Sequence, residues 1–289
     1  LIRLLVSEGH EVYALCRPGS NKLDNIIKNE RVHIVHADIS DITAVGQSIG
    51  CGCNAFFHFA WCGTSGAERN DSRVQSANIG YTLDAVELAH SLGCEVFVGA
   101  GSQAEYGRAD GKISPDTPCF PENAYGASKL AAGQLSRIAC AKYGMRHIWA
   151  RILSVYGVGD NSFTITVSSL TKMLGGKVAE FTPAEQMWDF LYCDDAARAF
   201  YLMAKNGKDG AVYTLGSGVA RPLKEYITLM HKASGTESEI KIGAIPYNDK
   251  QVMYLCADIS ALTADTGFVP QVSYEEGIKE TVKWLKGSK

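Results

Sequence analysis

A tyrosine and a lysine stand four residues apart in NAYGASKLAA, residues 123–132, as Tyr125 and Lys129. On a helix this spacing places both side chains on one face, where they can point into the same cleft. A phenol with an ordinary pKa of ~10 is a poor base at neutral pH, and an ammonium group within ~4 Å favours its ionised form. The pair has the chemistry of a general acid and base for a sugar or steroid hydroxyl.

The same spacing occurs a second time, as Tyr201 and Lys205 in YLMAK, and the surroundings separate the two pairs. Ser102 follows the strand-like run EVFVGAG, so its hydroxyl can hydrogen-bond the substrate oxygen that Tyr125 would protonate. No such hydroxyl precedes Tyr201 and Lys205, which lie near the end of a helical run. We interpret the second pair as part of a solvated helix surface.

The elements that must position these residues alternate along the first two thirds of the chain. Apolar runs of strand length are EVYALC, VHIVHAD, NAFFHFA, EVFVGAG and RHIWARIL. Between them, apolar residues recur at helical spacing in LDNIIKN, ITAVGQSI, VQSANIGYTLDAVELAHSL and AYGASKLAAGQLSRIACAKYG. Strict alternation of strand and helix predicts an α/β fold, a doubly wound parallel sheet with helices on both faces.

The bulk composition excludes several classes of partner. The net charge is −3 and no basic block occurs, so we expect no nucleic-acid partner. No apolar run approaches the ~18 residues of a membrane span, so we expect no membrane partner. The nine cysteines are an odd, scattered set without recurring CxxC pairs, which indicates a reduced, cytoplasmic protein and no metal site.

Ordered motifs along nearly the whole chain carry a family resemblance. They are GSQAEYG, PENAYGASKLAAGQL, ARILSVYGVGDN, MWDFLYCDDAARAFYLM, VYTLGSG and TGFVPQVSYEEGIKETVKWL. Together they resemble the extended short-chain dehydrogenase/reductases and, within them, the NAD(P)-dependent epimerase/dehydratase family acting on nucleotide sugars. The resemblance implies that Ser102 orients the substrate, Tyr125 is the acid/base, and Lys129 holds the nicotinamide ribose and tunes Tyr125.

The alternation of strands and helices loosens after about residue 156, which suggests a domain organisation. Residues 1–155 with about 191–217 would form a Rossmann-type dinucleotide-binding domain, and about 156–190 with 218–289 a smaller, discontinuous C-terminal substrate domain. The family begins with a strand and a glycine-rich loop that binds the pyrophosphate. Neither is present in LIRLLVSEGHEVYALCRPG; either both lie upstream of the printed sequence, which we favour, or the protein is natively truncated.

The end of the second strand of the family selects the cofactor. Cys16 stands where an Asp is often found, and Arg17 and Ser20 follow it. An arginine here accommodates a 2′-phosphate, which favours NADP over NAD; the alternative is that Arg17 is a solvated loop residue. By the same resemblance Asp38 and Ile39 flank the adenine, and the residues expected along the dinucleotide are Ala60, Trp61 and Asn78.

The acidic pair of the family's dehydratases is replaced by Gln103 and Ala104. Glu105 is one place further on, and we expect it to point elsewhere. A 4,6-dehydratase is therefore not expected. The remaining reactions transfer a hydride at a sugar carbon, most often C4, as an epimerase or a 4-ketoreductase, and the strand end that favours NADP tilts the choice toward a reductase.

Two substitutions concern the nucleotide sugar. Ser154 stands where an Asn is common, and Trp188 where an Arg often precedes the Asp. Trp188 either stacks on a base or packs in the core. The phosphates would then be held by other groups, and the candidate substrate contacts also include Gln103, Arg221 and Lys172 or Lys177.

Other readings stay open beside the enzyme. A non-catalytic dinucleotide-binding sensor and an inactive remnant are possible on the same fold. His58 and His147 lie in apolar strands and are interpreted as core histidines, and Asp194 and Asp195 as the start of a helix. A homodimer through helices 72–92 and 123–142 is expected from the resemblance.

Overall fold

The centre of the molecule is a parallel sheet with its strands in the order β10-β5-β4-β3. The computed structural model describes residues 1–20, 22–50, 52–249 and 251–287. The sheet strands are β3 (Ala55–His58), β4 (Val96–Ser102), β5 (Arg146–Ile152) and β10 (Ala211–Leu215). Ser102 and Leu215 both pair with Ile152, so these strands end at one carboxyl edge.

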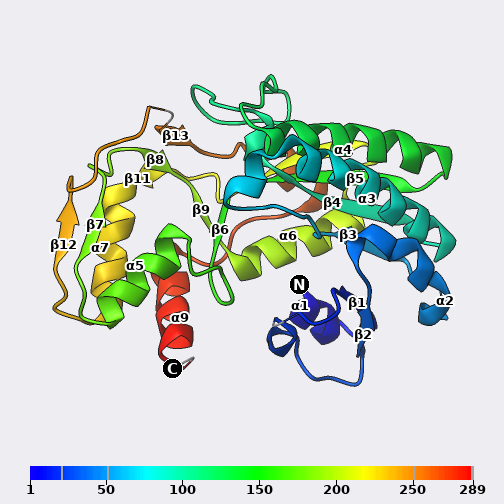
Figure 1. The fold of residues 1–289 in the computed structure, drawn as a ribbon, viewed down its shortest axis with the longest axis horizontal. Helices are drawn as coiled ribbons and strands as arrows, with labels where there is room; N and C mark the ends of the chain where they lie inside the picture. Colours follow the sequence, from blue (N-terminus) through cyan, green and yellow to red (C-terminus); the bar gives the residue numbers. More distant parts are fainter. Residues whose placement is uncertain (21, 51, 250, 288–289) are drawn as a thin grey trace.

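Helices cover both faces of this sheet, as the alternating pattern predicts (Figure 1). One face carries α3 (Ser72–Ser91) and α4 (Ala124–Lys142), and the other carries α6 (Cys193–Asn206) and α8 (Ser260–Thr266). Alternate residues of β4 enter the two cores: Phe97 packs on the side of α3, and Val98 on the side of α6. Strands buried on both faces explain why their sequences are continuous apolar runs.

The N-terminal segment forms a second parallel ladder. Helix α1 (Ile2–Ser7) precedes β1 (Val12–Cys16), which pairs in parallel with β2 (Val32–His36). Both strands were predicted. The expected helix over residues 23–29 is wrong: only a 3-10 turn, η1 (Leu23–Asn25), forms there, and none of its residues is buried. So short a segment needs a buried face to stay helical.

The helix expected over residues 42–49 is likewise divided into short pieces, η2 (Ile39–Val45) and α2 (Gly46–Ile49). Asp38 caps η2, because its carboxylate accepts a hydrogen bond from the Ser40 backbone N–H at 3.0 Å. This segment packs on α3 through Ile42 and Ile49. Its position, directly after β2, brings Asp38 to the carboxyl edge of that strand.

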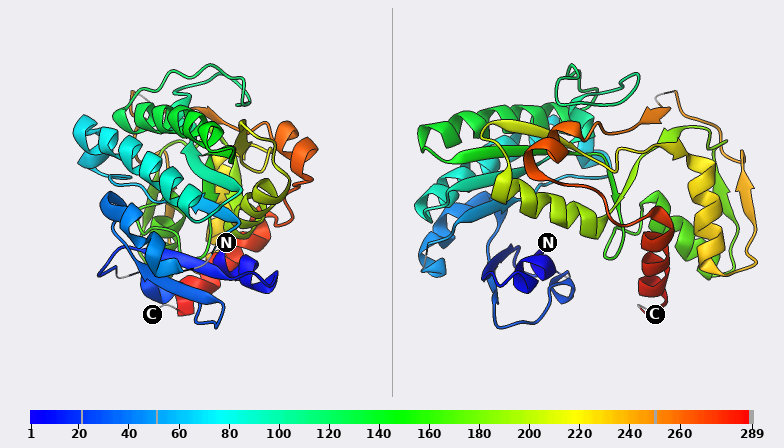
Figure 2. Two further views of the ribbon diagram at one scale, coloured as in Figure 1. Left: turned by 90° about the vertical axis from the view of Figure 1, so that its right-hand side faces the viewer. Right: turned by 180° about the vertical axis from the view of Figure 1, so that it is seen from behind.

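A second lobe with its own aromatic core lies beside the sheet (Figures 1 and 2). Its helices are α5 (Ile165–Leu174), α7 (Leu223–Ser234) and α9 (Tyr274–Gly287), which pack around Tyr156, Phe190 and Tyr226. Short strand pairs complete it: β6 (Ser154–Tyr156) with β9 (Phe190–Tyr192), β7 (Ala179–Phe181) with β12 (Ile240–Ile242), and β8 (Met187–Trp188) between β11 (Arg221–Pro222) and β13 (Tyr254–Leu255).

The proposed division into two domains has one mixed segment. Leu262 of α8 and Phe268 pack in the same core as Phe200 of α6, under the sheet. This segment falls within residues 218–289, which our division gives to the smaller domain, and that division stays a proposal. Within the described residues, no helix has the length and apolar character needed to cross a bilayer.

Candidate active site

Ser102 is the last residue of β4 and begins the 3-10 turn η4 (Gln103–Glu105) as its N-cap. Its hydroxyl oxygen accepts a hydrogen bond from the Ala104 backbone N–H at 3.2 Å, and its own backbone N–H donates to Glu105 Oε1 at 2.8 Å. These two bonds form a capping box, which fixes the backbone at this point. The Ser102 hydroxyl is thereby held at the carboxyl edge of the sheet.

Tyr125 lies in the first turn of α4, which begins beside η4. The Asn123 side chain caps this helix by accepting from the Gly126 backbone N–H at 2.8 Å. A Cβ atom on residue 126 would collide with the carbonyl oxygen of Ala104, so glycine is required for this close approach. The approach brings Tyr125 to Ser102, and hydrogen bonding with Ser102 is among the interactions that lower the pKa of Tyr125.

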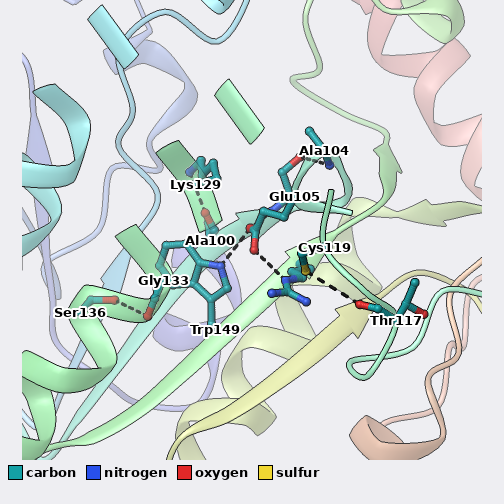
Figure 3. A network of polar contacts seen from close by, with 11 residues as sticks. Ala100, Ala104, Glu105, Thr117, Cys119, Lys129, Gly133, Ser136 and Trp149 are labelled. Carbon is teal, nitrogen blue, oxygen red and sulfur yellow. Dashed lines mark hydrogen bonds and ion pairs between the residues drawn. The ribbon is translucent and has the colours of Figure 1, made fainter. Parts of the chain in front are cut away.

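Lys129 lies one turn further along α4 and is 3 % exposed. Its ammonium group donates to the Ala100 carbonyl oxygen of β4 at 2.7 Å (Figure 3) and lies 3.8 Å from the centroid of the Trp61 ring. The Trp61 ring in turn meets the Tyr125 ring edge-on, with 6.0 Å between centroids. The pKa of Lys129 is lowered to about 7, mainly by burial; the charge of Glu105 opposes this shift and that of Arg69 adds to it.

The electrostatics of Tyr125 differ from what the sequence suggests. Burial raises the pKa of Tyr125, and the expected lowering by Lys129 is not found. The Lys129 ammonium is turned toward Ala100 and lies 5.8 Å from the Tyr125 ring centroid. The strongest opposing influence is instead Arg69, whose guanidinium carbon lies 3.9 Å from that centroid. No sequence motif pointed to Arg69, because it comes from a loop with no periodic pattern.

Glu105 points away from the cleft, as predicted. Its carboxylate is fully buried, and besides the Ser102 backbone it accepts from Trp149 Nε1 at 3.0 Å and from Arg151 Nε at 2.6 Å. Figure 3 shows Glu105 and its hydrogen bond with Trp149. Arg151 is buried as well, and its guanidinium lies 4.5 Å from the centroid of the Tyr106 ring. Through Glu105, the network holds the backbone of Ser102 in place.

The residues expected at the adenosine end come together at the strand ends. The Arg17 charge lowers the pKa of Asp38, although hydrogen bonds from Ser40 are the larger cause. Burial raises the pKa of the Cys62 thiol, and both Asp38 and Arg17 influence it. The loops that follow β1, β2 and β3 therefore converge. Ser20 follows Arg17 in a turn, with its N–H donating to the Arg17 carbonyl oxygen at 3.2 Å; the remaining expected contacts at these strand ends are Ile39 and Ala60.

Asn78 and Gln75 of α3 hold the loop after β3. The buried Asn78 amide accepts from the Cys62 N–H at 2.7 Å and donates to the Cys62 carbonyl oxygen at 3.1 Å and to Val74. Gln75 accepts from Trp61 Nε1 at 2.9 Å and donates to backbone carbonyls of the same loop. We expected Asn78 along the dinucleotide; its side-chain amide is engaged by the backbone of this loop. Gln75 was missed because a glutamine near a helix start carries no signal.

The second lobe contains a cleft of about 620 Å³, and only some of the candidate substrate contacts line it. Ser154, Trp188 and Lys172 line it, and Trp188 Nε1 donates to the Ser154 hydroxyl at 2.9 Å. Arg221 is engaged elsewhere, in an ion pair with Glu275 at 2.8 Å. The remaining candidates, Gln103 and Lys177, are not among the lining residues.

The other singled-out residues are structural. Burial lowers the pKa of His58 to about 3 and that of His147 to about 4, so both are neutral core histidines. Asp195 pairs with Arg198 and accepts two backbone N–H bonds. Lys205 is exposed at the surface of α6, as interpreted. Within the part of the chain that the structure describes, no three metal-binding side chains form a cluster.

A parallel sheet wound on both faces, with polar side chains gathered where its strands end, defines a Rossmann-type α/β protein. Residues 1–216 match the family described as the NAD dependent epimerase/dehydratase family. The chain belongs to this family, as its motifs predicted.

The chain matches its curated relatives over different fractions of their length. CDP-abequose synthase of Salmonella muenchen is 27% identical over 285 residues, which cover 97% of this chain and 91% of the synthase. The dTDP-D-glucose 4,6-dehydratase of Mus musculus is 27% identical over 220 residues, which cover 72% of this chain. The matched region spans only 61% of that dehydratase.

Solved structures share the fold. UDP-glucose 4-epimerase from Thermotoga maritima, with UDP-glucose, superposes with a TM-score of 0.87 at 22% identity, over 99% of this chain and 94% of the epimerase. RMD from Pseudomonas aeruginosa, complexed with NADPH, gives 0.80 at 20% identity, over 92% and 93%. UDP-glucuronic acid 4-epimerase from Bacillus cereus, in complex with NAD, gives 0.84 at 20% identity, over 99% and 94%.

Proposed function

We propose that this protein is an NAD(P)-dependent oxidoreductase or isomerase of a nucleotide-activated sugar, with hydride transfer at C4. The observation that carries the proposal is the convergence of Ser102, Tyr125 and Lys129 where β4 and α4 meet. The names of the similar proteins, which act on CDP-, dTDP- and UDP-linked sugars, support the substrate class.

The residues present fit a nicotinamide dinucleotide laid along the carboxyl edge. At the adenosine end, hydrogen bonds from Ser40 and, less strongly, the Arg17 charge lower the pKa of Asp38, and the buried amino group of Lys129 lies at the other end. An exposed arginine after β1 suits a 2′-phosphate, so NADP is favoured over NAD. Ser20, Ile39, Ala60 and Trp61 would contact the dinucleotide between these ends, while Asn78 holds the loop that carries Trp61.

The proposed reaction divides its tasks among three side chains. When bound, the nicotinamide accepts or donates the hydride. Tyr125 exchanges a proton with the C4 oxygen, and Ser102 polarises that oxygen by hydrogen bonding. Lys129 holds the ribose with its ammonium group.

Reduction of a 4-keto sugar is favoured over epimerisation, because NADP suits an enzyme that exchanges its cofactor in each turnover. Dehydration is disfavoured. Gln103 and Ala104 carry no acid, and the carboxylate of Glu105 is committed to Arg151 at 2.6 Å. No carboxylate would then be available beside Ser102 to remove water across C5 and C6.

The cleft that holds Ser154 and Trp188 is proposed to take the sugar nucleotide. The hydrogen bond between these two side chains fixes the indole ring of Trp188. We therefore favour a packing role for Trp188, as part of the cleft wall, over stacking on a base of the substrate. Lys172 is the favoured phosphate contact since it lines the cleft, and Arg221 would first have to leave Glu275. We further propose a homodimer through α3 and α4, where Leu135 and Ile138 are exposed.

Turnover assays with defined sugar nucleotides test the proposal. The protein is incubated with NADPH or NADH and CDP-, dTDP- or UDP-linked 4-keto hexoses, and separately with NADP+ or NAD+ and the corresponding hexoses. Consumption of the reduced nicotinamide with a 4-keto sugar identifies a reductase. Interconversion of C4 stereoisomers without net consumption identifies an epimerase, and formation of a 4-keto-6-deoxy sugar would contradict both.

The rival functions give different results in the same experiment. A dinucleotide-binding sensor binds NADPH or NADH but converts none of the sugars. An inactive remnant neither binds the cofactor nor converts a sugar. The intact set of Ser102, Tyr125 and Lys129 argues for catalysis, because a protein that only binds has no need of the phenol.

A further inference from the structure

The face of the Tyr125 ring is covered by a cation from outside its own helix. Arg69 belongs to η3 (Ala67–Asn70), in the connection between β3 and α3. Its guanidinium carbon lies 3.9 Å from the Tyr125 ring centroid, within the range of a cation–π contact. Its Nη1 donates to the Thr64 carbonyl oxygen at 2.9 Å, which orients the guanidinium over the ring.

The loop that carries Arg69 is held from both sides. Gln75 Nε2 donates to the carbonyl oxygens of Gly63 at 2.7 Å and Glu68 at 2.9 Å, and Gln75 is fully buried. On the other side, the Asn70 side chain accepts from the Ala124 backbone N–H at 3.1 Å, where α4 begins. The loop and the first turn of α4 are thus joined one residue from Arg69 and one residue from Tyr125.

Other groups near Tyr125 also influence the ionisation of its phenol. Lys129 from α4 lies further from the ring than Arg69, bonded to Ala100 and stacked on Trp61. Glu105 from η4 acts against ionisation of the phenol, but its charge is paired with Arg151. Ser102 contributes a hydrogen bond and no charge, and the neutral His58 faces Lys129.

We propose that Arg69 is a positioning residue that stabilises the ionised form of Tyr125 in the reaction proposed above. The inference rests on that function for its meaning, but the coupling of Arg69 to Tyr125 can be measured without turnover. In the direction of alcohol oxidation the phenolate must form before the proton is taken. Loss of Arg69 therefore moves the rise of the rate with pH to higher pH.

The test places a fluorinated tyrosine, whose phenol ionises near neutral pH, at position 125 and follows its fluorine signal as the pH is changed. A single label reports this one phenol among the 13 tyrosines of the chain. Arg69→Met is expected to raise the midpoint by about one pH unit, a tenfold loss in the ionisation constant. Arg69→Lys, which keeps the charge on a shorter stem, is expected to shift it by less.

Arg73→Met is the matched control, because Arg73 is an exposed arginine in the first turn of α3. Its midpoint should equal that of the unsubstituted labelled protein. A folded Arg69→Met protein with the same midpoint as Arg73→Met would overturn the inference. If the midpoint shifts while no sugar nucleotide is turned over by the wild-type protein, the coupling stands and the proposed function fails. In the active enzyme, the pH profile of kcat/KM should move in the same direction.

Discussion

The backbone N–H of Ser102 donates to Glu105 Oε1 at 2.8 Å, and the other carboxylate oxygen accepts from Arg151 Nε at 2.6 Å. The end of β4 that carries Ser102 is therefore anchored by a buried ion pair between Glu105 and Arg151. A buried carboxylate that is both paired and hydrogen-bonded specifies one arrangement, since each partner would be left unsatisfied in another.

Glu105→Gln should destabilise the fold by about 3–5 kcal/mol, because it leaves the Arg151 charge buried without a counterion. The amide oxygen can still accept from the Ser102 N–H, so the effect reports the lost charge. Urea unfolding at neutral pH measures it. The control is Glu122→Gln, which breaks the exposed pair of Arg108 and Glu122 and should cost no more than about 1 kcal/mol. Equal effects of the two substitutions would contradict the role of burial.

Lys129→Met should stabilise the protein, and the gain should depend on pH. Burial lowers the pKa of Lys129 from 10.5 to about 7, so the unfolded chain binds its proton more tightly than the folded one. The destabilisation of the folded protein by the buried, protonated Lys129 is fully present below about pH 7 and disappears as the pH rises toward 10.5.

The measurement is the free energy of unfolding of the wild type and Lys129→Met from pH 6 to the highest pH at which both fold, roughly pH 10. The gain should be of the order of a few kcal/mol at the low end and should shrink steadily as the pH rises. Lys142→Met, at the exposed far end of α4, should show no such trend. A pH-independent gain for Lys129→Met would mean that the lysine is not desolvated.

Arg17→Ala should weaken NADPH binding about tenfold and leave NADH binding nearly unchanged, because the guanidinium would contact only the 2′-phosphate. Titrations followed by nicotinamide fluorescence give both constants. Arg31→Ala is the control: Arg31 is exposed, pairs with Glu11 at 3.1 Å, and precedes β2 at the opposite edge of the ladder. A similar loss for both cofactors would show that Arg17 does not read the phosphate.

The sequence predicted the architecture well where periodic patterns were long. The strands β1 to β5 and the helices α3, α4 and α6 follow from apolar runs and helical spacing, because burial on the sheet imposes these patterns. Residues 23–29 carry too few apolar side chains to bury a helical face, and only a short turn forms there.

Side-chain partners between distant segments could not be predicted in the same way. Examples are the contacts of Arg69 with Tyr125, of Trp188 with Ser154 and of Asn78 with Cys62. In each pair the two residues come from different segments, and the local sequence pattern of one segment does not indicate the other. Such contacts arise from tertiary packing and not from propensity or period. The direction of Glu105 was predicted, because it stands one place beyond the two positions of the family's acidic pair, Gln103 and Ala104.

The central claim is that Tyr125 transfers the proton, and Tyr125→Phe tests it most directly. The substitution removes only the phenol oxygen, so the affinity for NADPH or NADH should be unchanged. Turnover of the sugar nucleotide should fall by a factor of about 10² to 10⁴, the usual contribution of a general acid/base. Tyr201→Phe, in the second tyrosine and lysine pair, should retain full activity; near-normal turnover by Tyr125→Phe would contradict the account.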